Sequence, residues 1–205
     1  NRNNQIIIAD LNKDGLDDII YYFEECENKC NIKIKPFINN GHGFNFNNAK
    51  DITVKSNIPS SSINNLQIIN FHGLAYMDIL YYIKSQNTFI IKKITTNGST
   101  LSIGTGLSIQ TSNNILDVYP ARLNNDGRID FFVLGSGNEF IVVEENTPGN
   151  FQAIKTPVTT VGDDYRIGDF NGDGLDDIIR MANAQFLNIE LQSNSSPVFL
   201  SVPVG

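Results

Sequence analysis

The sequence predicts an all-β protein built from about four units of four antiparallel strands each. Three observations lead to this prediction. A short loop motif recurs along the 205 residues, each copy lies between runs rich in β-branched and aromatic residues, and no segment has the 3.6-residue periodicity of an amphipathic helix. The charged share of 18% is too low to favour a disordered chain, and the length allows a buried core.

The recurring motif is clearest in its first and last copies. ADLNKDGLDDII begins at Ala9, and GDFNGDGLDDII begins at Gly168. A partial copy, ARLNNDGRIDFF, begins at Ala121, and a strongly altered copy, INFHGLAYMDIL, begins at Ile69 and keeps Asp78. Successive copies start roughly 50 to 60 residues apart, which is a period typical of repeat architectures.

Each copy of the motif is expected to be the loop of a β-hairpin. In the first unit, the runs 6–8 and 19–23 have strand composition, and the loop between them contains Gly15. A third strand is expected at 31–38, and a weaker fourth at 51–55. The later units have third strands at 88–94, 139–144 and 185–191.

Four strands in a unit of this length indicate a β-propeller blade. A β-sandwich has no reason to repeat one loop, and a parallel solenoid would have shorter and more regular coils. We therefore expect a single propeller segment over 1–205, either a small closed propeller or consecutive blades of a larger one. The approximate blades are 1–60, 61–112, 113–160 and 161–205.

The motif has the ligand pattern of an oxygen-only metal site. It reads Asp-x-Asn-x-Asp-Gly-x-x-Asp, and alternate side chains of such a loop point to one centre. Positions one, three, five and nine offer side-chain oxygens, position seven offers a backbone carbonyl, and glycine at position six permits the reversal. Hard oxygen donors with three negative charges favour calcium over softer metals and over magnesium. The alternative is a plain turn, in which Asp and Asn only cap the backbone.

Two copies keep every ligand position, so the sequence predicts two calcium ions. The side chains at position eight, Asp17 and Asp176, are expected to point away from the ions into solvent. The expected ligands are Asp10, Asn12, Asp14, Leu16 and Asp18 in the first loop, and Asp169, Asn171, Asp173, Leu175 and Asp177 in the last.

The copy that begins at Arg122 is expected to be a degenerate loop without metal. Arg122 replaces the first ligand, whereas Asn124, Asp126 and Asp130 keep their positions. A guanidinium cannot ligate a cation, but it bonds strongly to carboxylates. We therefore expect Arg122 to take the place of the ion against Asp126 or Asp130; the alternative is that its side chain extends into solvent. The copy that begins at Asn70 has lost most ligands and should bind nothing.

Composition narrows the range of partners. The net charge is −7, from 22 acidic and 15 basic residues, and no cluster of Lys and Arg offers a surface for nucleic acid. No run of 18 apolar residues is present, so membrane insertion is not expected. The start at Asn1 is not a signal peptide and indicates a piece of a longer polypeptide. Cys26 and Cys30, at an expected hairpin tip, are either reduced thiols or a disulfide, and a disulfide would fit a secreted or cell-surface location.

These motifs resemble the FG-GAP or VCBS repeat, which occurs in the propeller of integrin α subunits and in many bacterial surface and secreted proteins. The loops at Asp10 and Asp169 match that repeat fully, and the loop at Arg122 matches in part. Residues 36–44, PFINNGHGF, resemble the stretch that follows the loop in the VCBS form. The resemblance implies a propeller with calcium in hairpin loops at the blade rim. It implies adhesion, ligand binding or scaffolding without choosing among them, since members include lectins and shell-forming regions of toxin complexes.

No residue pattern indicates catalysis. His42 and His72 lie in no recognisable triad or metal motif, and the acidic pairs are better explained as calcium ligands. The sequence therefore predicts a non-catalytic, calcium-binding extracellular module for recognition or adhesion, with a protein or glycan ligand. The alternative is a structural propeller segment of a larger secreted toxin-like or cell-surface assembly. Candidate contact residues are the doubled tyrosines, of which half should face the core: Tyr21, Tyr22, Tyr81 and Tyr82.

Overall fold

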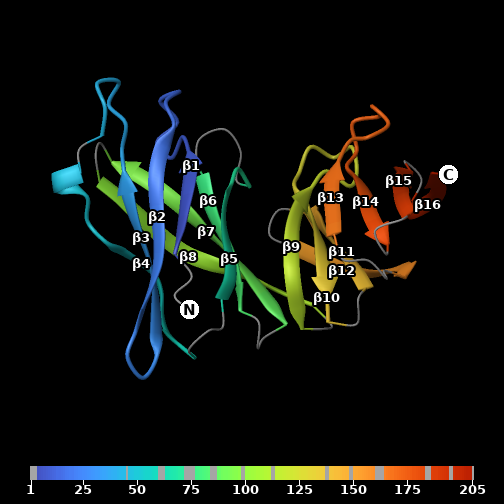
Figure 1. Ribbon diagram of the computed structural model, residues 1–205, viewed down its shortest axis with the longest axis horizontal. Helices are drawn as coiled ribbons and strands as arrows, with labels where there is room; N and C mark the ends of the chain where they lie inside the picture. Colours follow the sequence, from blue (N-terminus) through green and yellow to red (C-terminus); the bar gives the residue numbers. More distant parts are fainter. Residues whose placement is uncertain are drawn as a thin grey trace. The chain divides into compact units, whose positions relative to one another are not determined.

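The structure is a computed structural model, and the prediction of an all-β fold is confirmed in the part of the chain that it describes. That part contains sixteen β-strands and one short 3-10 helix, Phe46–Asn48 (Figure 1). The strands form four antiparallel sheets of four strands each. The described residues are 4–44, 46–59, 63–71, 77–83, 87–97, 100–111, 114–136, 139–147, 150–159, 164–182, 186–193 and 196–204.

The chain divides into two compact units, residues 1–85 with 89–108, and residues 86–88 with 109–205. The first unit contains two sheets, except that the first residue of β7 and the last two residues of β8 are assigned to the second unit. One sheet has the order β1 (Gln5–Ala9), β2 (Asp18–Cys26), β3 (Cys30–Phe37) and β4 (Ile52–Ile58). The other has the order β5 (Ile63–Ile69), β6 (Met77–Ile83), β7 (Thr88–Asn97) and β8 (Thr100–Gln110).

The second unit contains the other two sheets. One sheet consists of β9 (Ile115–Ala121), β10 (Asp130–Gly135), β11 (Glu139–Thr147) and β12 (Asn150–Thr159). The other consists of β13 (Asp164–Gly168), β14 (Asp177–Ala182), β15 (Phe186–Ser193) and β16 (Ser196–Val204). In all four sheets consecutive strands are neighbours, so each sheet is a meander, as a propeller blade requires.

Strands β2 and β3 show why these residues form a sheet with one buried face. Along β2, buried residues alternate with half-buried ones from Asp18 to Glu24, and along β3 they alternate from Cys30 onward. This two-residue period places Ile20, Ile32 and Ile34 in the core. The core of the first unit also takes residues from β5, β6 and β7, so its two sheets share one hydrophobic cluster.

Strand β6 differs, because both of its faces are buried. Every residue from Asp78 to Ile83 is buried, and the continuous apolar run fits a strand covered on both sides. The expectation that one tyrosine of each pair faces outward holds for Tyr21 and Tyr22 but is wrong for Tyr81 and Tyr82, which are both buried. Burial raises the pKa of Tyr81 to about 12.

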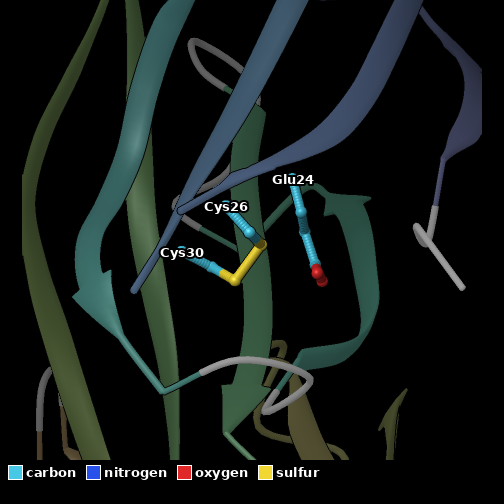
Figure 2. A group of neighbouring side chains, drawn as sticks. All are labelled: Glu24, Cys26 and Cys30. Carbon is cyan, nitrogen blue, oxygen red and sulfur yellow. A yellow bond between two sulfur atoms is a disulfide. The ribbon is translucent and has the colours of Figure 1, made fainter. Parts of the chain in front are cut away.

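The two cysteines close the tip of the hairpin between β2 and β3. Cys26 lies opposite Cys30 in the register of the two strands, and their sulfur atoms are joined in a disulfide (Figure 2). Of the two alternatives from the sequence, the structure therefore supports the disulfide and not two reduced thiols. No helix in the described part of the chain is long and apolar enough to cross a membrane.

Candidate metal-binding loops

The motif loops occupy equivalent places in the sheets. Three of them join the first two strands of their sheets: β1 to β2, β9 to β10, and β13 to β14 (Figure 1). The altered copy lies between β5 and β6, and its residues 72–76, which include His72, are outside the described residues. The hairpin placement that the sequence predicts is thus confirmed for the three copies that keep a glycine at position six.

In the first loop, the side-chain oxygens at positions one, three and five accept hydrogen bonds from backbone amides of the loop. Asp10 accepts hydrogen bonds from the amides of Asp14 at 3.1 Å and Gly15 at 2.8 Å. The side-chain oxygen of Asn12 accepts from that same Asp14 amide at 3.1 Å, so the oxygens of Asp10 and Asn12 lie on one side of the loop. Asp14 in turn accepts from the amide of Leu16 at 2.9 Å.

The last loop repeats this arrangement almost bond for bond. Asp169 accepts from the amides of Asp173 at 3.1 Å and Gly174 at 2.9 Å, and Asn171 accepts from the Asp173 amide at 2.8 Å. These hydrogen bonds, the one from Gly174 first among them, lower the pKa of Asp169. The carboxylate therefore stays charged, which is the state a cation requires.

Two positions of the loop need a left-handed backbone, and only one was predicted. Glycine at position six has a φ of 87° at Gly15 and 90° at Gly174, as expected for the reversal. Position four also has positive φ, 61° at Lys13 and 80° at Gly172. Gly172 in the last copy is the sequence signal for this second requirement, which was not predicted.

The aspartate at position nine is buried in all four copies. Asp18, Asp78, Asp130 and Asp177 each have 0% of their surface exposed. Asp18 accepts hydrogen bonds from the amides of Leu11 at 2.9 Å and Asn39 at 2.8 Å, and burial raises its pKa. Position nine thus closes the base of the loop as well as offering an oxygen.

This structural role explains why the altered copy keeps its aspartate. Asp78 accepts from the amide of Phe71 at 3.1 Å, and Asp177 accepts from Phe170 at 3.0 Å. Both donors hold position two of their loops, as Leu11 does in the first loop. The retention of Asp78 in a copy that has lost most of the other ligands was the sequence signal for this role.

Asn39 is a further residue of the first loop's surroundings, and its role was not predicted from the sequence. Besides its bond to Asp18, it donates from its side chain to the carbonyl of Asp17 at 3.3 Å and accepts from the amide of Gly41 at 3.0 Å. Asn39 also pairs with Phe44 through a β-bridge. The segment PFINNGHGF therefore packs its turn against the first motif loop.

Comparison with known families identifies the region around the last two loops. Residues 122–179 match a family model described as the FG-GAP-like repeat. This stretch is similar to an FG-GAP-like repeat. It confirms the resemblance over those residues, and with four-stranded meander sheets it makes the chain a β-propeller-like module. No curated protein matched the chain in a sequence comparison.

Within residues 122–179, the loop at Arg122 keeps part of the turn of the intact loops. Asn124 accepts from the amide of Asp126 at 3.0 Å, and Asp126 accepts from the amide of Arg128 at 2.9 Å. The buried Asp130 accepts from the amide of Glu145 at 2.9 Å. Gly127 at position six keeps the positive φ of the intact loops, at 78°, but Asn125 at position four does not have it. The backbone of a metal loop is therefore retained only in part.

The predicted partner of Arg122 was wrong. Its guanidinium lies 3.6 Å from Asp176, at position eight of the next motif loop, and not against Asp126 or Asp130. The cation against Asp126 is Arg128, whose Nη2 lies 2.8 Å from Oδ2. The reason is the course of the backbone: the Asp176 amide donates to the carbonyl of Arg122 at 2.8 Å, which places the two residues side by side.

The two position-eight aspartates consequently differ. Asp17 is exposed, as predicted. The side chain of Asp176 is only 14% exposed, and it accepts a hydrogen bond from the amide of Arg122 at 2.7 Å. The expectation that Asp176 points into solvent was therefore wrong, because a neighbouring strand end covers it.

The donor chemistry of the two intact loops fits calcium. All candidate ligands are oxygens, and those at positions one, three and five accept hydrogen bonds from amides of their own loop. Among the described residues, the group of three potential ligand side chains within 4.8 Å of one another is a different one, Glu24 with Cys26 and Cys30 (Figure 2). Its sulfurs are joined in the disulfide, so they are not thiolate ligands.

The candidate contact residues are mostly unavailable for a ligand. Tyr22 is buried and donates its hydroxyl hydrogen to Glu24 at 2.9 Å, and Tyr81 and Tyr82 are buried in β6. Tyr21 is half-buried and stacks on Phe23, with 5.3 Å between the ring centroids. Of the four, only Tyr21 offers part of its ring to a partner.

Proposed function

We propose that the chain is a non-catalytic, calcium-binding module that acts outside the cell as a recognition or adhesion surface. The observation that carries the proposal is the near-identical hydrogen-bond pattern of the loops at Asp10 and Asp169. Two loops separated by most of the chain hold their side-chain oxygens in the same places relative to the loop amides. A plain turn requires neither three carboxylates nor their repetition.

Calcium would neutralise the charge that each loop concentrates. The first loop holds Asp10, Asp14 and Asp18 within nine residues, and the backbone amides around them are its internal source of positive potential. The ion would be held by the side-chain oxygens of positions one, three, five and nine, and by the carbonyl of Leu16 or Leu175. Bound there, it supplies the charge compensation that lets the carboxylates lie together.

Two features support an extracellular location and an exposed binding surface. The Cys26–Cys30 disulfide is typical of oxidising compartments. Two large aromatic side chains are exposed. Phe170, 45% exposed, lies in the last motif loop, and Phe46, 60% exposed, begins the 3-10 helix between β3 and β4. A protein or glycan ligand would use such aromatic contacts.

A structural role in a larger assembly is the second candidate, and one observation favours it. Ile6 and Ile8 are 68% and 65% exposed on β1, an edge strand, and their spacing of two places them on one face. An outward apolar pair on a sheet edge suits packing against further protein. Glycan-array and pull-down binding separate the two candidates, because a purely structural segment binds no sugar.

Calorimetric titration with calcium tests the metal assignment. We expect two ions per chain, falling to one in Asp14→Asn and one in Asp173→Asn. Asp126→Asn is the matched control, since Asp126 holds the same position in the degenerate loop, and its titration should equal that of the unmodified chain. Binding of no ion, or equal loss in the control, contradicts the assignment.

A further inference from the structure

Arg122 and Asp176 contact each other through both backbone and side chains. The Asp176 amide donates to the Arg122 carbonyl at 2.8 Å, the Arg122 amide donates to Asp176 Oδ2 at 2.7 Å, and the guanidinium lies 3.6 Å from Oδ1. The contact joins the loop after β9 to the loop before β14, in two different sheets of the second unit. Neither loop alone would order the side chain of Asp176.

The place of Asp176 in its loop gives this contact a consequence. Its chain neighbours are Leu175, whose carbonyl is a proposed ligand, and Asp177, whose carboxylate is another. Leu175 and Asp177 are buried, and Asp177 is bound to the Phe170 amide. Holding the amide and the carboxylate of Asp176 therefore fixes the peptide units that carry positions seven and nine.

We propose that Arg122 is a positioning residue for the calcium site of the following loop. The inference rests on the proposed function. Arg122 stands at the first ligand position of its own loop but cannot bind a cation there. Through Asp176, it orders the segment 175–177 of the Asp169 loop before an ion binds. A segment that is already ordered in the free protein loses less conformational entropy when the ion binds, so the affinity of that site rises.

A purely electrostatic role would have the opposite sign. The guanidinium is positive, and it lies 3.6 Å from Asp176 in this loop, close enough for its charge to act on the site. A nearby positive charge repels calcium, and its removal alone would tighten binding. Positioning predicts that removal of the side chain weakens binding. The direction of the change in affinity therefore separates the two roles.

The first loop provides the matched control. Asp17 occupies the same position eight, but it is exposed, and its side chain makes no bond within the described part of the chain. Substitution of Asp17 or Asp176 by alanine removes one negative charge from the same place in equivalent loops. Only the second change also removes a contact with Arg122, so their difference isolates that contact.

The test is calcium titration of the whole chain in an Asp14→Asn background, which leaves the Asp169 loop as the remaining site. We expect Arg122→Ala to raise the Kd about 2- to 5-fold, as loss of a partly exposed ion pair implies. Asp176→Ala should raise it about 10-fold, because a charged hydrogen bond is also lost. Arg122→Lys should restore part of the affinity. In the chain with Asp14 intact and Asp173→Asn, Asp17→Ala should change the Kd of the first loop about twofold or less.

Thermal unfolding in chelator supplies an ion-free measurement. We expect the Arg122→Ala and Asp176→Ala variants to show coupling in a double-mutant cycle. An unchanged or tighter Kd in Arg122→Ala overturns the positioning role even if the cycle shows coupling. A wild-type chain that binds no calcium at the Asp169 loop instead overturns the proposed function, and the cycle in chelator still reports whether the contact exists.

Discussion

Lys13 and Gly172 hold the same place in the two intact loops and share a left-handed backbone, with φ angles of 61° and 80°. A residue with a side chain is strained in this region, by roughly 1–2 kcal/mol, whereas glycine is not. A Cβ built at Gly172 meets nothing within 4 Å, so the backbone angle alone decides the preference. The first loop therefore carries strain that the last loop avoids.

Relief of this strain is the first prediction. Lys13→Gly should raise the free energy of unfolding by about 0.5–1 kcal/mol, since part of the relieved strain is offset by the greater chain entropy of glycine. Gly172→Ala should lower it by about 1 kcal/mol. Urea unfolding measures both changes. Destabilisation by Lys13→Gly would show that the lysine side chain contributes more than its backbone costs.

The second prediction concerns Asp78, the buried aspartate of the altered copy. Asp78→Ala should lower the free energy of unfolding by about 1–3 kcal/mol, because the half-buried Phe71 amide loses its bond to the fully buried Asp78. The calcium stoichiometry should stay at two. Asp17→Ala, at an exposed aspartate, is the control and should change stability by less than about 0.5 kcal/mol. A neutral Asp78→Ala would confine the role of position nine to metal binding.

The third prediction concerns calcium and stability together. Extracellular calcium modules bind with Kd values of roughly 10⁻⁴–10⁻³ M. At about 10 mM calcium, each occupied loop should then add about 1–3 kcal/mol to the free energy of unfolding. Melting curves in calcium and in chelator measure this difference. The variant with both Asp14→Asn and Asp173→Asn should melt at one temperature under the two conditions, and a continued calcium response there would place the ions elsewhere.

The strands and loops were predictable because their signals are local. Alternation along β2 and β3, the glycine at position six, and the recurrence of one loop motif each depend on residues within a single hairpin. The sequence left two interpretations of Cys26 and Cys30, a disulfide or two reduced thiols. The register of β2 and β3 places the two cysteines opposite each other, which favours the disulfide.

The errors came from contacts between hairpins. Arg122 was assigned to its own loop because sequence spacing shows only the positions within one motif. Its true partner, Asp176, lies in the loop before β14 of the next sheet, and the contact depends on how that loop approaches the end of β9. Tyr81 and Tyr82 were misjudged for the same reason, since period two in a strand does not reveal whether its second face is covered.

The last prediction is the rebuilding of a third metal site in the degenerate loop. Relative to the intact loops, this loop has arginine at two positions: Arg122 replaces aspartate at position one, and Arg128 replaces the leucine at position seven. Arg128 already pairs with Asp126 at 2.8 Å and donates to the Glu145 carbonyl at 2.9 Å. The ligand at position five is therefore occupied by an internal cation.

Arg122→Asp alone should consequently add no third calcium ion, because Arg128 would still hold Asp126. The double variant Arg122→Asp with Arg128→Leu restores the residues of the intact loops at both positions and should raise the calorimetric stoichiometry from two to three. Its matched control is Arg122→Asn with Arg128→Leu, which lacks the first carboxylate and should bind a third ion at least tenfold more weakly. A third ion in the Arg122→Asp single variant would show that Arg128 yields to calcium. Two ions in the double variant would mean that the carboxylate placed beside Asp176 cannot turn into the loop.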